Sequence, residues 1–159
     1  MAGKKRPGAA AAPDASRELV ITRRFDAPRD LVWKAWSERE RAMKWWGPHG
    51  FTLTHLEWDQ RPGGAWRAVM RSPDGREYPQ HGVYKEIRPP ERLVYTFIWD
   101  EDGPESEMLV TVTFAERGGK TDMTFRKGPF TSRESQKGEE GGWGETFERL
   151  AGFLARNGG

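Results

Sequence analysis

Six short strand-like segments follow one another between residues 51 and 125, and this succession constrains the fold more than any other feature of the sequence. Within 65–71, Trp66, Ala68 and Met70 alternate with residues of the other parity, which is the period of a strand with one covered face. Turn-forming residues separate the segments, so we expect neighbouring strands to pair as an antiparallel meander. The segments span 51–58, 65–71, 82–87, 92–99, 108–114 and 121–125, with RPGG, SPDG, RPPE, DEDGP and ERGGK between them.

A first strand and two short helices are predicted before this meander. The strand is ELVITRRF (18–25), after which Pro28 fits the first turn of a helix. Ser37 and Glu40 have the spacing of a capping box, which predicts the start of a second helix, and the Gly-Pro pair at 47–48 would end it. The apolar stripes of the two helices are Leu31, Val32, Ala35 and Trp36, and then Ala42, Met43 and Trp46.

The last part of the chain is predicted to be a long helix that covers the sheet. Its apolar stripe is Trp143, Phe147, Leu150 and Leu154, spaced by four, three and four residues. Thr131 and Glu134 offer a capping box, but four glycines between 138 and 144 each weaken a helix by about 1 kcal/mol relative to alanine. The pattern therefore supports the helix from Trp143 onward better than its start. The order of elements indicates an α+β fold with helices on one side of a curved antiparallel sheet.

Composition and charge narrow the class of protein. The 159 residues suffice for one domain, expected at 18–157. The segment 1–17 holds four of the 26 basic residues and only one of the 24 acidic ones, and it is rich in alanine, proline and glycine. We interpret it as a disordered basic tail before a nearly neutral domain, and we expect no nucleic-acid binding. The sequence lacks cysteine and any apolar run of about 20 residues, so we expect a cytoplasmic protein without a membrane segment.

Few residues are suited to metal binding or catalysis. The histidines, His49, His55 and His81, do not have metal-ligand spacing, and we expect neither a metal nor a cofactor. A curved sheet could aim two strand carboxylates or a histidine into one cavity for acid–base chemistry. Charged strand residues usually face water, however, so the sequence favours a binding protein over an enzyme. The weak catalytic candidates are Asp59, Glu77, His81 and Glu86.

The stretch DQRPGG at 59–64 is predicted to be a structural turn. Asp59 and Arg61 can pair across a tight connection that Gly63 and Gly64 permit. This interpretation is favoured over a binding role for the same residues.

Five motifs occur in an order and spacing that resemble a known family. They are RRFDAPRDLVWKAWSERERAMKWWGP, DQRPGGAWRAVM, SPDGRE, GVYKEIRPPERLVYTF and the GW of GGWGETFERLAGFL. Over about residues 18–155 the chain resembles proteins similar to the C-terminal domain of the activator of heat-shock-protein-90 ATPase, within the START-like, SRPBCC superfamily. The resemblance implies a helix-grip fold, in which a curved sheet holds the long helix, two small helices close one end, and a cavity lies between.

The resemblance leaves three functions open. In the wider superfamily the cavity takes lipids, polyketides and other apolar molecules, and some members act as cyclases or hydrolases. The eukaryotic co-chaperones carry a separate N-terminal domain that engages the chaperone, whereas only 17 low-complexity residues precede the expected fold here. The alternatives to ligand binding are thus an enzyme that uses His81, Glu77 or Glu86 in the cavity, and a co-chaperone-like interaction module with an exposed apolar patch.

Binding of a small apolar or aromatic molecule is the leading hypothesis. Eight tryptophans and eight phenylalanines exceed what a domain of this size needs for filling, and aromatic walls suit flat apolar ligands. In the pair Trp45-Trp46, we expect Trp46 at the mouth of the cavity and Trp45 packed between its helix and a neighbouring loop. The protein would be a monomer or a homodimer. The expected cavity residues are Trp46, Trp66, Met70, Tyr84, Phe97, Trp99, Met123, Trp143 and Phe147.

Overall fold

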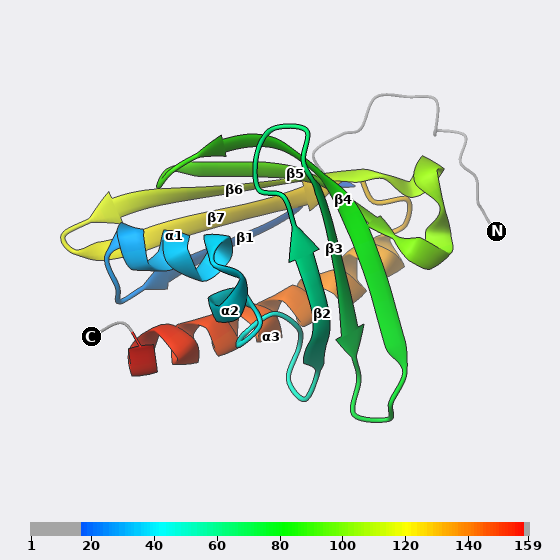
Figure 1. Ribbon diagram of the computed structural model, residues 1–159, viewed down its shortest axis with the longest axis horizontal. Helices are drawn as coiled ribbons and strands as arrows, with labels where there is room; N and C mark the ends of the chain where they lie inside the picture. The colour runs from blue at the N-terminus through cyan, green and yellow to red at the C-terminus, as the bar shows by residue number, and fades with distance from the viewer. Residues whose placement is uncertain (1–16, 158–159) are drawn as a thin grey trace.

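The structure of the chain, a computed structural model, describes residues 17–157 and contains one curved antiparallel sheet with helices against it (Figure 1). The seven strands lie in the order β1-β7-β6-β5-β4-β3-β2. The elements are β1 (Leu19–Phe25), α1 (Arg29–Ser37), α2 (Arg39–Ala42), β2 (Thr52–Trp58), β3 (Ala65–Arg71), β4 (Glu77–Arg88), β5 (Arg92–Trp99), the 3₁₀ helices η3 (Asp100–Asp102) and η4 (Pro104–Ser106), β6 (Met108–Arg117), β7 (Lys120–Gly128) and α3 (Arg133–Asn157). The predicted succession of strand, two helices, six strands and helix is confirmed.

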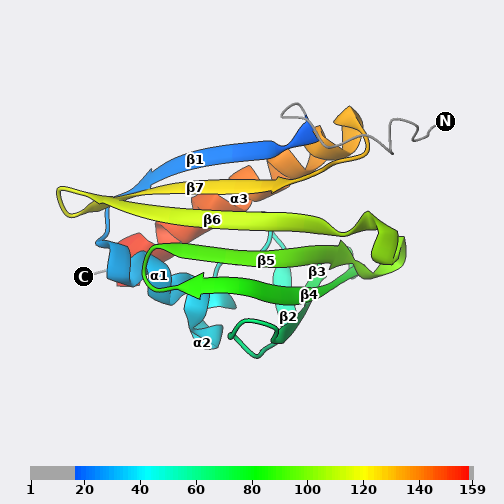
Figure 2. The same cartoon turned by 90° about the horizontal axis from the view of Figure 1, so that it is seen from above.

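The sheet curves around α3. Seen from above, β1, β7, β6, β5 and β4 lie side by side, and β3 and β2 turn away from them (Figure 2). In Figure 1, α3 lies along one face of the sheet and α1 and α2 stand near its carboxyl-terminal half. This is the helix-grip arrangement that the sequence predicted.

The start of β4 differs from the prediction. β4 begins at Glu77 rather than at residue 82, because residues 77–81 continue the pairing with β3. The predicted tail 1–17 lies outside the described residues except for Arg17, whose carbonyl accepts the N–H of Phe130 at 2.9 Å.

Both predicted capping boxes are wrong in detail. Glu38, not Ser37, precedes α2, and the Ser37 hydroxyl instead donates to the carbonyl of Trp33 within α1. At the start of α3 the cap is Ser132, whose hydroxyl oxygen accepts the N–H of Ser135 at 3.0 Å. The helix then continues through all four glycines, so tertiary packing outweighs their low helix propensity.

Aromatic rings fill the space between α3, the sheet and the short helices. Trp36 of α1 packs at 5.0 Å, between ring centroids, from Trp45, and at 6.1 Å from Phe147 of α3. Trp45 is fully buried, and its indole N–H donates to the carbonyl of Ala35 at 3.1 Å. The predicted stripe of α3 is buried along its length and joins this cluster.

Gly82 leaves room for the indole of Trp66 to extend over β4 to β5. Trp66 on β3 stands opposite Gly82 on β4, and its indole N–H passes over that residue to donate to the carbonyl of Thr96 at 3.0 Å. A Cβ on Gly82 would lie 1.9 Å from that carbonyl oxygen and 2.5 Å from the Trp66 nitrogen. The indole of Trp66 is therefore fixed within the core by β4 and β5.

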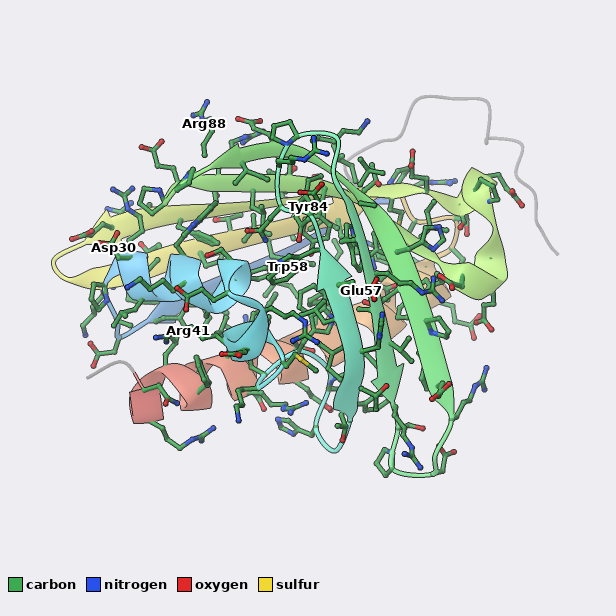
Figure 3. The ribbon with its side chains drawn as sticks, in the orientation of Figure 1. Asp30, Arg41, Glu57, Trp58, Tyr84 and Arg88 are labelled. Atoms are coloured by element: carbon green, nitrogen blue, oxygen red, sulfur yellow. The ribbon has the colours of Figure 1, made fainter. Side chains whose placement is uncertain are left out.

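Two neighbouring tyrosines in the core differ in their hydrogen bonding. The ring of Tyr84 on β4 lies 5.9 Å from the ring of Tyr95 on β5 and 6.5 Å from Trp58. Figure 3 shows Tyr84 near Trp58, whereas Arg88, further along β4, points away from the sheet. The hydroxyl of Tyr84 accepts a hydrogen bond from Gln60 at 3.2 Å, but among the described residues the buried hydroxyl of Tyr95 has no partner.

This difference predicts opposite effects of two matched substitutions. Tyr95→Phe removes an unpaired buried hydroxyl, so the free energy of unfolding should stay the same or rise by about 1 kcal/mol. Tyr84→Phe removes a satisfied hydroxyl and should lower the free energy of unfolding by about 1 kcal/mol. Urea unfolding of both variants provides the comparison, and a larger loss for Tyr95→Phe than for Tyr84→Phe would contradict it.

Candidate ligand-binding site

A cavity of about 470 Å³ lies between the amino-terminal half of α3 and the sheet. The loop after α2 closes one side of it, and η3, η4 and the connection from β7 to α3 close the other. Its volume is within the range of about 300–1,000 Å³ that is usual for small-molecule sites. The rings in its wall are those of Trp46, Phe51, Tyr78, Phe97, Trp99, Phe130 and Trp143.

Glycines on α3 leave this space open. Ser135, Gly138, Glu139, Gly142 and Trp143 all line the cavity, and their spacing of three and four residues places them on one stripe of the helix. A Cβ added to Gly138 would meet no atom within 4 Å. Two of the four glycines that weaken the helix, Gly138 and Gly142, therefore keep large side chains out of the cavity.

Arg149 of α3 binds the backbone of the loop that closes the cavity. Arg149 Nη1 donates to the carbonyls of Gly47, Pro48 and Phe51 at 2.9, 3.1 and 3.0 Å. Burial lowers the pKa of Arg149 from its ordinary value. Since an arginine stays protonated in proteins, this clamp keeps its charge at any ordinary pH.

Trp46 and Gln80 form the inner wall. The indole N–H of Trp46 donates to Gln80 Oε1 at 3.3 Å, and both side chains line the cavity. Gln80 lies on the inward face of β4 and is only 1% exposed. The two adjacent tryptophans thus differ in place, with Trp46 at the cavity and Trp45 in the core.

A buried ion pair stands behind the cavity wall. Lys127 of β7 is fully buried, and its Nζ lies 2.5 Å from Glu139 Oε1 and 3.3 Å from the centroid of the Phe97 ring. Glu139 also accepts the indole N–H groups of Trp99 at 2.9 Å and Trp143 at 3.2 Å. The carboxylate of Glu139 lines the cavity with three donors already bound to it.

Burial and pairing act in opposite directions on Lys127. Burial lowers the pKa of its ammonium group, the charge and hydrogen bond of Glu139 partly offset that effect, and the resulting pKa is about 8. The Phe97 ring adds a cation–π contact that stabilises the protonated form. Lys127 is thus mainly charged near neutral pH although no part of its side chain reaches solvent.

Sequence reasoning missed this pair, although a signal for it exists. Met123, Phe125 and Lys127 share one parity on β7, so a charged residue occurs on the face that carries the core. Glu139 lies four residues before Trp143, which places it on the buried stripe of α3. An inward lysine and an inward glutamate on facing elements could have been paired on these grounds.

The structure brings together only part of the expected cavity set. Trp46, Met70, Phe97, Trp99 and Trp143 line the cavity. The other four expected residues are core side chains away from it, because the rings and helices around them leave no space. They are Trp66, which lies across Gly82, and Tyr84, Met123 and Phe147, each at most 4% exposed.

The catalytic candidates lie on the outer face of the sheet, away from the cavity. His81 stands opposite Arg67 in the pairing of β4 with β3, and its Nδ1 lies 2.6 Å from a carboxylate oxygen of Asp100. Burial raises the pKa of Asp100, but hydrogen bonds from His81 and Arg67 outweigh it and hold that pKa below its usual value. This is a surface ion-pair cluster.

The two glutamate candidates have equally ordinary surroundings. Glu77 is exposed and stands opposite Arg71. An irregularity between Tyr84 and Glu86 turns Glu86 outward, where it pairs with Arg92 at 3.1 Å. His81, Glu77 and Glu86 thus do not line the cavity, where the enzyme alternative needs them.

The DQRPGG stretch forms a tight connection between β2 and β3. Arg61 Nε lies 2.8 Å from Asp59 Oδ2, with both side chains more than half exposed. Gly63 has a positive φ of 86°, and a Cβ on Gly64 would lie 1.8 Å from the carbonyl oxygen of Asp59. The backbone of this turn therefore requires its glycines, whereas the exposed ion pair contributes little.

Residues 17–157 contain no group of three or more histidine or carboxylate side chains placed to hold a metal ion. No helix in this range is both long and apolar enough to cross a bilayer.

The large hydrophobic side chains that are exposed within residues 17–157 are Val20 on β1 and Leu109 on β6, which β7 separates. These two side chains are not on neighbouring strands, and the co-chaperone-like alternative stays a prediction.

The curved seven-stranded sheet, the two short helices after its first strand and the long carboxyl-terminal helix define a START-like, helix-grip protein. The sequence profile of the family described as activator of Hsp90 ATPase homolog 1-like protein matches residues 26–155. The chain belongs to this family.

Solved structures share the arrangement. A protein of Nitrosomonas europaea is 26% identical, with a TM-score of 0.80, over 91% of this chain and 97% of the other. A protein of Chromobacterium violaceum is 26% identical, with a TM-score of 0.81, over 87% and 97%. The AHSA1 protein of Silicibacter pomeroyi has the same fold at 24% identity, with a TM-score of 0.80 over 88% and 99%. No curated protein matches the sequence.

The buried lysine predicts a distinctive pH dependence of stability. Between the folded pKa of about 8 and the ordinary value of 10.5, the unfolded chain binds a proton that the folded chain does not, so raising the pH stabilises the fold. From about pH 8 to about pH 9.5, wild type should gain up to about 1.4 kcal/mol per pH unit relative to Lys127→Met. Urea unfolding across this range measures the difference.

A matched control lies on the same strand. Lys120→Met, at the exposed start of β7, should keep a constant difference from wild type over the same pH range. The buried tyrosines are common to all three proteins, so their titration cancels. A constant difference for Lys127→Met as well would show that Lys127 does not lose its proton in this window.

Proposed function

We propose that this protein binds a small molecule with an apolar or aromatic body in the cavity between α3 and the sheet. The observation that carries the proposal is the cavity of about 470 Å³ itself, walled by seven aromatic rings in a fold whose core is otherwise closely packed. Rings in such a wall contact a flat ligand over a large area without losing much side-chain freedom.

The polar groups at the cavity support binding rather than chemistry. Gln80 is engaged by Trp46, and Glu139 is engaged by Lys127 and two indole groups. A catalytic base or nucleophile needs an available lone pair or proton near the substrate. The polar groups of the inner wall are hydrogen-bonded to one another and hold the surrounding rings in place. This arrangement favours binding over catalysis.

The glycines of α3 give a direct test of the site. Gly138→Leu should fill the cavity and lower the affinity for a neutral aromatic probe, naphthylmethanol, at least about tenfold, because the side chain occupies ligand space. Calorimetric titration measures the affinity. Thermal unfolding should show no loss of stability, since leucine is a better helix former than glycine.

Gly141→Leu is the matched control. Gly141 lies in the same helix, and a Cβ there also meets no atom within 4 Å, but Gly141 does not line the cavity. It should gain the same helix propensity and keep the affinity of wild type. Equal affinities of the two variants would sink the proposal that this cavity is the binding site.

A further inference from the structure

The charged residues that line the cavity are all acidic. Three carboxylates line it, those of Glu101, Asp102 and Glu139, and among the described residues that line it none is basic. Glu101 and Asp102 come from η3, at the rim, whereas Glu139 comes from the inner stripe of α3. A bound molecule would therefore have its apolar body among rings and one end beside acidic groups.

The three carboxylates differ in whether a cation already neutralises them. Glu139 is paired with Lys127 at 2.5 Å. Glu101 has a loose, exposed contact of 3.8 Å with Arg76. Within residues 17–157, Asp102 has no cation at ion-pair distance, so its negative charge is the one left uncompensated at the rim.

The surroundings of Asp102 confirm that negative charge accumulates there. Burial, and then the like charges of Glu101, Glu139 and Glu105, raise the pKa of the Asp102 carboxyl above its usual value. The ionised form of such a carboxyl is stabilised when a cation approaches and destabilised when another anion does. The amino end of α3 also reaches this rim, but Ser132 Oγ already accepts the N–H of Ser135 there.

The aromatic wall is compatible with a cation as well. Lys127 lies 3.3 Å from the Phe97 centroid, 5.5 Å from that of Trp99 and 5.6 Å from that of Trp143. These three rings also line the cavity, and they already stabilise one ammonium group by cation–π contact. Glu139 balances the charge of Lys127, so the pair does not repel a second cation.

We infer that the ligand of this cavity is an organic cation, with an aromatic or other apolar body among the rings and an ammonium group at the rim beside Asp102 and Glu101. The inference rests on the proposed binding function and names the chemical class of its ligand. It excludes fatty acids and other carboxylates as preferred ligands, because their head groups would face the uncompensated carboxylate of Asp102 at the rim.

Three probes with one naphthyl body separate charge from shape. They are naphthylmethylammonium, naphthylmethanol and naphthylacetate, titrated calorimetrically into the full chain. The ammonium probe should bind at least about tenfold more tightly than the acetate, with the alcohol between them. Added salt should weaken binding of the ammonium probe and leave that of the alcohol unchanged.

Substitution at the rim locates the effect. Asp102→Asn should weaken binding of the ammonium probe about three- to tenfold, as expected for a partly exposed charge pair, and should leave the alcohol unaffected. Asp30→Asn, on the outside of α1 and away from the cavity, is the matched control and should change neither affinity.

The outcomes distinguish the two proposals. If the alcohol binds and the ammonium probe binds no more tightly than the acetate, the inference of a cationic ligand is overturned while the binding function stands. An ammonium preference that survives Asp102→Asn together with Glu101→Gln overturns the assignment of the rim. Absence of binding by all three probes overturns the binding function itself.

Discussion

The packing of α3 against the curved sheet is the constraint on which the other features depend. Phe125 of β7 lies 4.5 Å from Trp143 and 5.2 Å from Phe147, between ring centroids, and Trp36 of α1 completes the contact. These contacts fix the middle of α3 and its position against α1. The amino-terminal half carries glycines where large side chains would complete the core. The cavity is therefore the part of the sheet surface that α3 covers without filling.

The buried ion pair is costly to the fold and is best understood with the cavity. Removing two charges from water requires several kcal/mol per ion, and an apolar pair of similar size is often equally stable or more stable. Lys127 nevertheless lies behind the wall and pairs with Glu139, which also accepts the indole N–H groups of Trp99 and Trp143. The pair thus sets the orientation of two rings that a ligand would meet, which a purely apolar replacement could not do.

More of the fold than of the site could be predicted from the sequence. Alternation within 65–71 and the stripe through Trp143 and Phe147 predicted the sheet and its covering helix, because periodicity reports which face is buried. Periodicity does not report whether a buried ring meets another ring or an open space. Trp66 and Trp143 both face inward, yet only Trp143 reaches the cavity, because the position of Gly82 beneath Trp66 depends on strand register. From the sequence, the glycines of α3 indicate only a weakened helix, because the space that they leave depends on the surface opposite.

The position of Trp46 has an optical consequence. Its ring lies 6.1 Å from Trp36, 5.7 Å from Trp45, 6.3 Å from Trp66 and 5.9 Å from Trp143, between centroids. At such separations excited indoles exchange energy faster than they emit, so light absorbed by any of the five is shared among them. Two of the five, Trp46 and Trp143, line the cavity. Emission from these five indoles therefore responds to a change at the cavity wall.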